Sequence, residues 1–393
     1  MRILFLSPRQ CWPAHSGAKL REYHFLRALS LRGEVTYLHF TEPGSAPLTR
    51  EDLPFCHEVV AVPKPSAYGP WKMIQGVAGR WPLTILNYTS PEMTAAIARL
   101  TSGTRFDLVH LDSIHMMRCA EALPEAKIVY NWHNIESEAM ERYSATVASP
   151  AKRWYARHTA QKLRACESDI LRTAIGHVVC SQRERDQLQR IAPKARIAVV
   201  ANGVDMQYFA NAGMRSAPGQ DLVFVGSMAY YPNAEAAVSF SGNVWLAVRA
   251  RMPQTRLMIV GANPGPEVVA LARLPGVAVT GTVPDVRPYY GSAWAAIVPL
   301  RTGGGTRLKI LEAMAAGVPV ISTPLGAEGL EVTPGRDILI AGADDAEAWV
   351  RHLESLAECR QPLVTAALDL VRTRYDWEAL GETLWSTYED WLR

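Results

Sequence analysis

The sequence predicts an α/β protein whose two Rossmann-like, doubly wound domains face each other across a cleft. Short apolar stretches alternate with amphipathic ones along both halves of the chain, as in parallel sheets with crossover helices. The alternation begins afresh after a segment that bears Gly, Ser and Pro, 211–220, which we interpret as a linker. A length of 393 residues also exceeds what one hydrophobic core usually organises. We therefore place the first domain at 1–208, the second at 209–374 and a C-terminal helix at 375–393.

The first domain opens with the order strand, loop, helix, strand that begins a doubly wound sheet. We expect these elements at 2–7, 8–19, 20–31 and 35–40. The long loop lies at the carboxyl edge of the sheet, where such folds bind ligands, and Gly17 lets the backbone approach a ligand there. Arg21 and His24 begin the helix and face the same crevice or, in the alternative, are solvated helix residues.

Residues 41–105 are weakly patterned, and we predict irregular structure for them. Part of this stretch mixes aromatic and apolar side chains with cations: Tyr68, Trp71, Lys72, Met73, Arg80 and Trp81. Such a mixture is typical of a membrane interface, although surface loops with exposed aromatics also carry it. We keep peripheral membrane contact as one hypothesis and an ordinary surface loop as the other.

Four further strands complete the first domain. We expect them at 106–111, 127–130, 176–181 and 197–200, with a basic helix at about 150–172 between the second and the third. His133 follows the second of these strands directly. A histidine just past a parallel strand lies at the edge where ligands bind, so His133 is a candidate site residue, and a purely structural histidine is the alternative.

The second domain repeats the alternation. Strands are expected at 222–225, 256–260, 277–280, 295–300 and 318–321, with helices at 233–250 and 266–273 and a short one that ends at Tyr290. In the C-terminal segment an apolar stripe predicts an amphipathic helix, and its members are Leu380, Leu384, Tyr388 and Leu392. We expect this helix to cross back and pack on the first domain.

The strongest candidate for a ligand site is a unit of strand, glycine loop, helix and strand in the second domain. The loop consists of Gly303, Gly304 and Gly305. Thr306 is a suitable N-cap for the helix, which ends before Gly317. Glycines before a helix let a ligand approach the backbone, and the free N–H groups at the helix end attract an anion. The sequence therefore predicts a phosphate site.

Two cations, Arg307 and Lys309, follow in the first turn of that helix. The helix dipole disfavours positive charge there, so the pair is locally unfavourable unless an anion binds. Glu312 lies one turn after Lys309. A surface ion pair between these two residues, on an ordinary core helix, is therefore the alternative.

Composition limits the classes of function and the compartment. The formal net charge of +3 gives no case for a nucleic-acid partner. Six cysteines show neither CxxC pairs nor zinc-ligand spacing, which favours reduced thiols in a cytoplasmic protein. No stretch approaches the roughly 18 apolar residues of a membrane-spanning helix. The apolar run at 3–6 is too short for a signal sequence and fits a first strand.

The chain carries five motifs whose types and order are informative together. They stand at 130–136 (YNWHNIE), 201–205 (ANGVD), 224–233 (FVGSMAYYPN), 281–286 (GTVPDV) and 299–323 (PLRTGGGTRLKILEAMAAGVPVIST). With these motifs the chain resembles the GT-B glycosyltransferases of family 4, above all bacterial sugar transferases associated with exopolysaccharide assembly. The resemblance covers nearly the whole chain. It implies retaining transfer of a sugar, with a hexosyl group favoured, from a nucleotide diphosphate sugar to an acceptor hydroxyl.

The resemblance also implies what each domain binds. The first domain would bind the acceptor, which is a lipid-linked or polysaccharide intermediate at the inner membrane face in our first hypothesis and a soluble small molecule in the second. The second domain would bind the nucleotide-sugar donor. No metal and no other cofactor is expected, because dipoles and cations of the protein neutralise the diphosphate.

Roles for single residues follow from their places in the motifs. Catalytic roles are implied for His133, beside the transferred sugar, and for Arg307 and Lys309 at the diphosphate. Donor contacts are implied for Gly226, Ser227, Val283, Gly303, Gly304, Gly305, Thr306, Leu308 and Glu312. Glu312 would hold the ribose hydroxyls, and Val283 would meet the base through its backbone. Acceptor contacts are expected from Gly17, Arg21 and His24.

Two departures from the family pattern concern the donor site. Gly304 stands where the Glu-x7-Glu motif has its first Glu, so backbone N–H groups must read the donor sugar. The Arg and Lys that commonly follow the strand-end glycine are missing after Gly226, and we infer that Arg307 and Lys309 supply that charge. No pair of carboxylates suits double displacement, which favours front-face transfer.

Three other classes of function remain as alternatives. A two-domain oxidoreductase would need a GxGxxG motif after the first strand, which the sequence lacks. A nucleotide-sugar 2-epimerase would share the whole architecture. A non-catalytic module that binds nucleotide-sugars would share the donor site.

Overall fold

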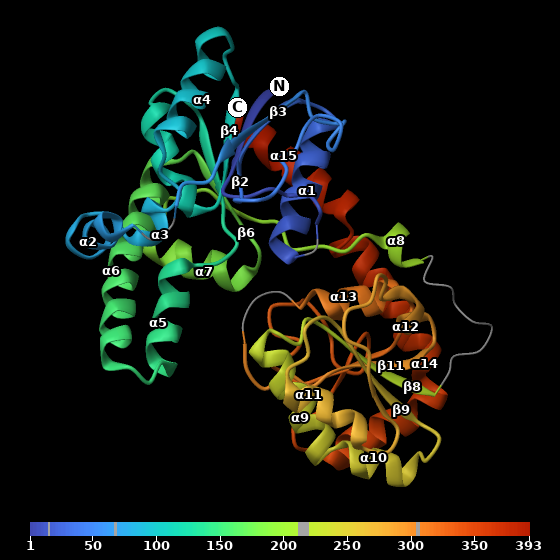
Figure 1. Ribbon diagram of the computed structural model, residues 1–393. Helices are drawn as coiled ribbons and strands as arrows, with labels where there is room; N and C mark the ends of the chain where they lie inside the picture. Colours follow the sequence, from blue (N-terminus) through green and yellow to red (C-terminus); the bar gives the residue numbers. More distant parts are fainter. Residues whose placement is uncertain (15, 67–68, 211–219, 304–306) are drawn as a thin grey trace. The chain divides into compact units, whose positions relative to one another are not determined.

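The chain folds into two compact units, each built around one parallel sheet (Figure 1). The computed structural model describes all residues except 15, 67–68, 211–219 and 304–306. One unit comprises Met1–Ala201 and Gly381–Arg393, and the other comprises Asn202–Leu380. The expected linker, 211–220, lies outside the described residues except for its last position.

The first unit holds a sheet of seven parallel strands in the order β3-β2-β1-β4-β5-β6-β7. The strands are β1 (Arg2–Ser7), β2 (Glu34–Thr41), β3 (Glu58–Pro63), β4 (Leu108–Asp112), β5 (Ile128–Asn131), β6 (Gly176–Val179) and β7 (Ile197–Val199). The strand order reverses between β1 and β4, which is where sheets of this kind bind ligands at their carboxyl ends. The predicted doubly wound sheet is therefore confirmed.

Helices connect most of these strands. They are α1 (Gly17–Ser30), α2 (Pro70–Ala78), α3 (Leu83–Leu86), α4 (Pro91–Gly103), η1 (Ile114–Ala122), α5 (Glu136–Thr146), α6 (Pro150–Thr173) and α7 (Gln182–Ile191). The prediction of irregular structure for 41–105 was wrong, since β3 and three helices lie there. Their apolar pattern is weak because α2 buries only Gly76 and α4 only Met93 and Ile97.

The second unit holds six parallel strands in the order β10-β9-β8-β11-β12-β13. The strands are β8 (Asp221–Val225), β9 (Arg256–Val260), β10 (Val277–Val279), β11 (Ala293–Val298), β12 (Val320–Ser322) and β13 (Leu339–Ile340). The helices are α8 (Met206–Ala210), α9 (Tyr231–Asn243), α10 (Trp245–Arg251), α11 (Pro266–Ala270), η2 (Leu271–Arg273), α12 (Arg287–Gly291), α13 (Leu308–Ala315) and α14 (Ala346–Arg374). The single helix expected at 233–250 is two helices that are separated at Val244, directly after the poor helix formers Gly242 and Asn243 at the end of α9.

The last helix, α15 (Trp377–Leu392), belongs to the first unit from Gly381 onward. Leu384 and Tyr388 of the expected apolar stripe are fully buried, and the Tyr388 hydroxyl lies 2.6 Å from His110 Nδ1. Gly381 lies so close to α1 that a Cβ there would come 2.8 Å from the Cβ of Ala28. The helix therefore packs on the first unit, as the stripe predicted.

The unit boundaries differ from the predicted domain boundaries at 208 and 374. Residues 202–208 and 375–380 belong to the second unit. The reason is a short pairing that joins them, in which Val204 N donates to Tyr375 O (2.8 Å) and Trp377 N to Val204 O (3.3 Å). A Cβ at Gly203 would come 2.6 Å from Tyr375 O, so the two segments are in direct contact.

Candidate active site

The helix α13 begins immediately after the glycine loop of the second unit. Leu308 is its first residue, and Arg307 occupies the N-cap position with only 5 % of its surface exposed. The assignment of the cap to Thr306 is therefore corrected, and Gly304, Gly305 and Thr306 themselves lie outside the described residues. The other two glycines behave as the sequence predicts, since Gly303 (φ 103°) and Gly317 (φ 70°) both adopt positive φ.

Lys309 lies against the carboxyl end of strand β8 rather than on the surface. Its Nζ donates a hydrogen bond to Asn233 Oδ1 (2.6 Å) and sits 4.6 Å from the centre of the Phe224 ring. A Cβ at Gly226 would come within 2.7 Å of the same nitrogen. Asn233 Nδ2 in turn donates to Ser227 O (2.8 Å). Predicted donor-site residues from two distant motifs thus meet around one ammonium group.

The environment of these cations disfavours their charge. Burial lowers the pKa of Lys309 to about 7, with Arg307 adding to the lowering and Glu312 opposing it. Burial also lowers the pKa of Arg307. The hydrogen-bond acceptor for Lys309 is a neutral amide, so the charge is not cancelled by its closest partner. An anion bound at this place would stabilise both charged forms and gain more than it would on an exposed lysine.

Glu312 is not the partner of Lys309 in a surface ion pair, as the alternative proposed. Its Oε2 accepts a hydrogen bond from the hydroxyl of the buried Tyr290 (3.3 Å), and burial raises its pKa. Val283 lies in the loop that follows β10, and both Val283 and Leu308 are partly exposed. These placements are compatible with the roles implied for the three residues and do not test them.

Tyr230 and Asn233 are two residues of this region that the sequence argument missed. Tyr230 is half exposed at the start of α9, and its hydroxyl would lie 3.3 Å from a Cβ at Gly303. It therefore borders both the glycine loop and the place of the missing family cations. The adjacent pair Tyr230–Tyr231 after a strand-end glycine was the available signal, since these residues follow a parallel strand at the edge where ligands bind.

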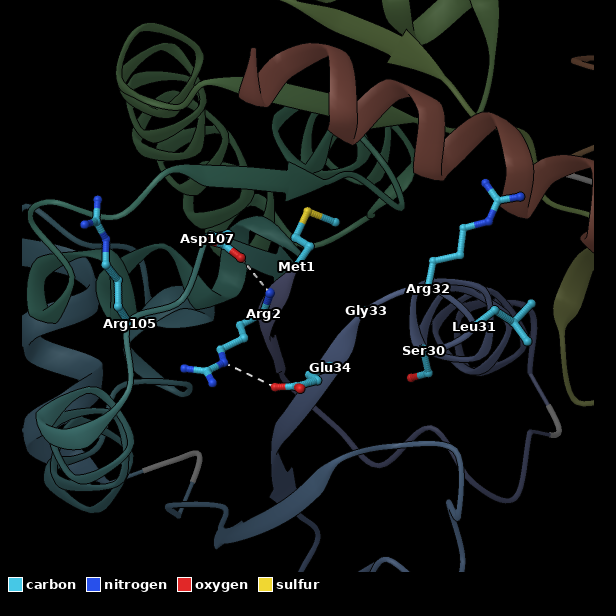
Figure 2. A pocket seen from close by; sticks show the side chains of 9 residues that line it. All are labelled: Met1, Arg2, Ser30, Leu31, Arg32, Gly33, Glu34, Arg105 and Asp107. Carbon is cyan, nitrogen blue, oxygen red and sulfur yellow. Dashed lines mark hydrogen bonds and ion pairs between the residues drawn. The ribbon is translucent and has the colours of Figure 1, made fainter.

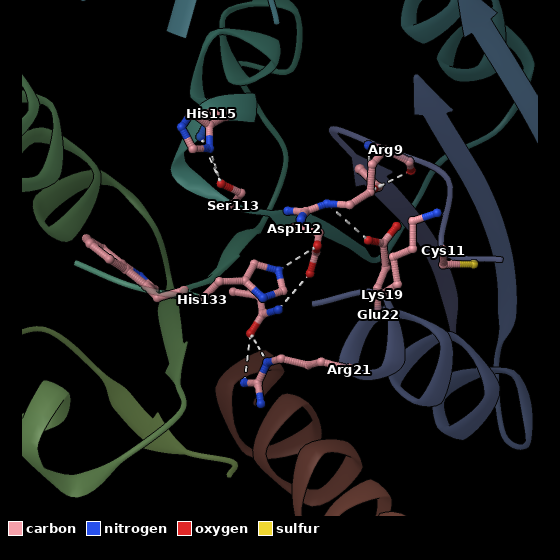
Figure 3. Close-up of polar contacts among 12 residues, drawn as sticks. Arg9, Cys11, Lys19, Arg21, Glu22, Asp112, Ser113, His115 and His133 are labelled. Atoms are coloured by element: carbon pink, nitrogen blue, oxygen red, sulfur yellow. Dashed lines mark hydrogen bonds and ion pairs between the residues drawn. The ribbon is translucent and has the colours of Figure 1, made fainter. Parts of the chain in front are cut away.

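In the first unit, His133 is held by a buried carboxylate at the carboxyl ends of β4 and β5 (Figure 3). Its Nε2 lies 2.8 Å from Asp112 Oδ2, and Asp112 is fully buried. Burial alone would raise the pKa of Asp112, but His133 and His110 hold it well below its usual value. An ionised carboxylate only accepts hydrogen bonds, so Nε2 carries a proton, and in the neutral ring Nδ1 is an acceptor.

Arg21 proves to be a structural residue, which corrects its expected role in acceptor binding. It is fully buried and donates to Asn131 Oδ1 from Nε (3.0 Å) and Nη2 (2.8 Å) and to Val200 O from Nη1 (2.7 Å). Asn131 Nδ2 then donates to Asp112 Oδ1 (2.6 Å). Figure 3 shows this chain of contacts from Arg21 to His133, which fixes the orientation of the histidine ring.

The other two expected acceptor residues lie on the same helix, α1. Gly17 is its first residue. His24 is only 8 % exposed and packs its ring at right angles to that of Tyr23 (5.4 Å between centroids). His24 is thus largely buried, and its expected contact with an acceptor stays a prediction.

A second polar cluster at this sheet edge escaped the sequence argument. Tyr37 Oη donates to Glu22 Oε1 (2.5 Å), and Arg9 Nε lies 3.7 Å from Glu22 Oε2. Burial and the nearby Asp112 raise the pKa of Glu22 to about 8, against the lowering effect of Arg9. Because Arg9 stands in the loop directly after β1, its position at the carboxyl edge was the signal that could have identified it.

Two family models match this chain. "Glycosyltransferase Family 4" matches residues 17–208, and "Glycosyl transferases group 1" matches residues 219–359. The chain belongs to the GT-B glycosyltransferases. The two matches span most of both units, so the transferase assignment covers the glycine loop as well as His133.

Curated relatives of the transferase are distant in sequence. It is 28% identical over 258 residues to D-inositol 3-phosphate glycosyltransferase of Rhodococcus opacus, covering 59% of this chain and 56% of the relative. It is 25% identical over 232 residues to GDP-mannose:cellobiosyl-diphosphopolyprenol alpha-mannosyltransferase of Xanthomonas oryzae, covering 55% of this chain and 58% of the relative. The matched part of the transferase thus spans little more than half the length of either relative.

Solved structures share the fold of the transferase over its whole length. Sucrose-phosphate synthase of Thermosynechococcus elongatus matches with a TM-score of 0.71 at 18% identity, covering 99% of each chain. HepE of Anabaena, solved with UDP and glucose, matches with a TM-score of 0.67 at 14% identity, covering 99% of this chain and 100% of HepE. At these identities the likeness establishes the architecture only.

Figure 2 shows a pocket of about 640 Å³ in the first unit of the transferase. It lies at the amino ends of the strands, whereas His133 follows the carboxyl end of β5. It is lined near the starts of β1, β2 and β4, where Arg2 pairs with Glu34 (3.2 Å) and Arg2 N donates to Asp107 Oδ2 (2.7 Å). Parallel sheets bind their ligands at the carboxyl ends of strands, so this pocket is not the active site.

Within the described part of the transferase, no group of three or more His, Cys, Asp and Glu residues is arranged to hold a metal ion. The helices described there include none that is both long and apolar enough to span a membrane.

Proposed function

We propose that this transferase moves a sugar from a nucleotide diphosphate sugar to an acceptor hydroxyl with retention of configuration at the anomeric carbon. The observation that supports this most is the place of Lys309. The Lys309 side chain is partly buried, its ammonium lies beside Gly226 and close to the amino end of α13, and its hydrogen-bond partner is a neutral amide. A positively charged group in such a place suits a ligand that carries negative charge, as a diphosphate does.

The proposed reaction proceeds on one face of the donor sugar. The bond from the anomeric carbon to the diphosphate oxygen breaks while the acceptor oxygen forms a new bond to the same carbon on the same face. The proton of the acceptor hydroxyl passes to an oxygen of the departing diphosphate. Lys309, Arg307 and the N–H groups of the helix end stabilise the negative charge that grows on that diphosphate.

His133 would take part from the first unit through its acceptor nitrogen, Nδ1. With Nε2 bound to Asp112, Nδ1 can accept a hydrogen bond from a sugar hydroxyl. Glu312 and Val283 would hold the ribose and the base, and Tyr230 adds an aromatic ring beside the glycine loop. No metal takes part in this proposal, since helix end and cations supply the positive charge.

The choice of donors to test is guided by the names of similar proteins, since the residues of this chain do not distinguish one nucleotide-sugar from another. HepE was solved with UDP and glucose, and the Xanthomonas relative is named for GDP-mannose. The same relative is named for a diphosphopolyprenol acceptor, whereas the Rhodococcus relative is named for inositol 3-phosphate. We therefore propose UDP- and GDP-hexoses as first donors to test, with a lipid-linked glycan as first acceptor and a soluble sugar or polyol phosphate as second.

The test has two stages. Thermal unfolding with single nucleotide-sugars identifies the donor, because a ligand of the folded state raises the apparent midpoint. NMR of the product then gives the configuration of the new bond, and an added chelator should leave the rate unchanged. An inverted product, or activity that the chelator abolishes and Mg²⁺ restores, contradicts the mechanism. Epimerised donor sugar in the absence of acceptor would favour the 2-epimerase alternative.

A further inference from the structure

Helix α2 of the first unit shows an unusual distribution of apolar side chains. Trp71, Met73, Ile74 and Val77 are all exposed, at 69, 51, 56 and 36 % of their surface. Their spacing places them on one continuous arc of the helix, because positions three and four apart share a face. The one buried residue of α2 is Gly76, which has no side chain to bury. The helix therefore presents its apolar face outward.

The attachment of α2 explains how this orientation is held. Lys162 of α6 donates from Nζ to three carbonyls at the end of α2, those of Gly76 (2.8 Å), Val77 (2.7 Å) and Gly79 (2.6 Å). On the other side Gly76 abuts α3, where a Cβ would come 2.9 Å from the Cβ of Leu83. The helix is thus held by hydrogen bonds to its backbone carbonyls and by the packing of Gly76. Its apolar side chains contribute little to the fold. Figure 1 shows α2 beside α3 and α6.

A further exposed aromatic residue lies on the face of α6 that also carries Lys162. Trp154 is 58 % exposed and stacks on His158 at a ring distance of 5.3 Å. His158 Nε2 lies 2.9 Å from Val77 O of α2. Since Trp154, His158 and Lys162 are spaced four residues apart, they share the face of α6 that meets α2. Trp154 therefore extends the apolar surface of α2.

The charge around this apolar surface is positive. Residues 69–80 and 150–165 together contain seven Lys and Arg residues and no Asp or Glu, in a chain whose formal net charge is only +3. The exposed side chains of Lys152 and Arg157 flank Trp154 in sequence. Two of the seven are paired with acids, Arg164 with Glu141 of the neighbouring helix α5 and Arg80 with Asp169 of α6. Glu138 of α5 pairs with Arg142 and Arg183 instead. Exposed apolar side chains that are bordered by cations suit a partner with an apolar interior and a negatively charged outer layer.

We propose that the α2 surface, defined as Trp71, Met73, Ile74, Val77 and Trp154 with Lys152 and Arg157, docks on the surface of an anionic lipid bilayer. The tryptophans and aliphatic side chains enter the boundary between headgroups and acyl chains, and the cations bind lipid phosphates. Charge complementarity selects this occupant over an uncharged apolar partner. The proposal does not depend on the donor site, because no residue of that site lies on this surface.

Flotation of the full chain with lipid vesicles tests the proposal. The wild type should float with vesicles of phosphatidylcholine and phosphatidylglycerol, and much less with phosphatidylcholine alone. Trp71→Ser with Ile74→Ser should weaken binding at least about tenfold, and Lys152→Glu with Arg157→Glu by a similar factor that shrinks as salt is added. Matched controls change exposed residues of the second unit, Leu246→Ser with Val269→Ser and Arg336→Glu, and should leave binding unchanged.

Three results would overturn the proposal. Wild-type protein that stays unbound to anionic vesicles would do so, as would variants of the α2 surface that bind like the controls. The third is a wild-type dimer in analytical ultracentrifugation that Trp71→Ser with Ile74→Ser converts to monomer, because a second copy would then be the occupant. Nucleotide binding followed by thermal unfolding shows that each variant is folded, and flotation uses neither donor nor acceptor. Failure here therefore leaves the proposed reaction standing.

Discussion

Buried charges are treated differently in the two units of this transferase. Around His133 the buried side chains of Arg21 and Asp112 each have several hydrogen-bond partners, since Arg21 donates to Asn131 and to Val200 O, and Asp112 is bound by His133 and Asn131. Around Lys309 the direct partner of the cation is the neutral Asn233, and burial lowers its pKa to about 7.

This difference indicates two ways of preparing a site. A network whose hydrogen bonds are already satisfied is rigid, so the ring of His133 is oriented before any ligand arrives. A partly buried cation without a bound anion lacks a negative partner, and an anionic ligand supplies that negative charge when it binds. We therefore expect substitutions near His133 to change the orientation of its ring and the stability of the protein. Substitutions at Lys309 should mainly weaken the interaction with the negative charge of the ligand.

The largest effect should come from Lys309→Met, which keeps the apolar stem against Phe224 and removes the charge. We expect kcat/KM to fall about 10²- to 10³-fold, as for the loss of one preorganised group that stabilises transition-state charge. Steady-state release of nucleotide diphosphate measures it, with Arg336→Met as control. Turnover equal to that of the wild type would remove Lys309 from the mechanism.

Arg21→Met should have the next largest effect, which is on the stability of the fold rather than on the binding of an anionic ligand. The change leaves Asn131 and the carbonyl of Val200 without their buried donor, which should lower the free energy of unfolding by about 2–4 kcal/mol. Urea unfolding measures this, with the exposed Arg27→Met on the same helix as control. A loss no larger than that of the control would contradict the structural role of Arg21.

Asp112→Asn should preserve packing but allow the amide to donate to the ring of His133, so that the wrong nitrogen carries the proton. We expect kcat to fall about tenfold to a hundredfold while the KM for the donor changes little. A change of tautomer should appear in the ¹⁵N shifts of His133, which a merely structural effect would not alter. Asp390→Asn, on the exposed side of α15, serves as control, and unaltered kcat with unaltered shifts would argue against the positioning role.

The smallest effect concerns pH. Because the pKa of Lys309 is about 7 in the free protein and a bound diphosphate raises it, binding takes up a proton above pH 7. Affinity for the nucleotide diphosphate should then fall by up to about tenfold per pH unit from 7 upward. The same lowered pKa means that the folded state loses the proton of Lys309 before the unfolded state does, so the ligand-free protein gains stability as pH rises from about 7 toward 10.5. Titration calorimetry in buffers of different ionisation enthalpy checks the proton uptake, which Lys309→Met should abolish.

Much of the fold could be predicted because strands and helices leave local patterns. Strands β1, β2, β8 and β9 appeared within one residue or so of their expected ends, since they are mostly apolar and largely buried. The prediction failed at 41–105, where α2 turns its apolar residues outward and α4 buries only two side chains. A hydrophobic pattern in the sequence predicts a helix or strand only where the fold buries the apolar residues of that element.

For the candidate site, the sequence identified Lys309, Gly226 and Asn131 as parts of motifs but not as neighbours of particular atoms. Arg21 was expected to face a ligand, and it faces Asn131, 110 residues away in the chain. A cation at the start of a helix looks the same in the sequence whether it points to solvent, to a ligand or to a buried amide. The difference depends on the strand that the helix packs beside.

The sequence by itself determined the alternation of strands and helices, the glycine loop before a helix with two cations, and the histidine after a strand, because each depends on neighbours along the chain. Only the tertiary structure decided that Lys309 meets Asn233, that Arg21 supports His133 through Asn131 and Asp112, and that α2 exposes its apolar face. Those contacts join segments far apart in the chain, and their energies arise from burial and partner geometry that no local pattern records.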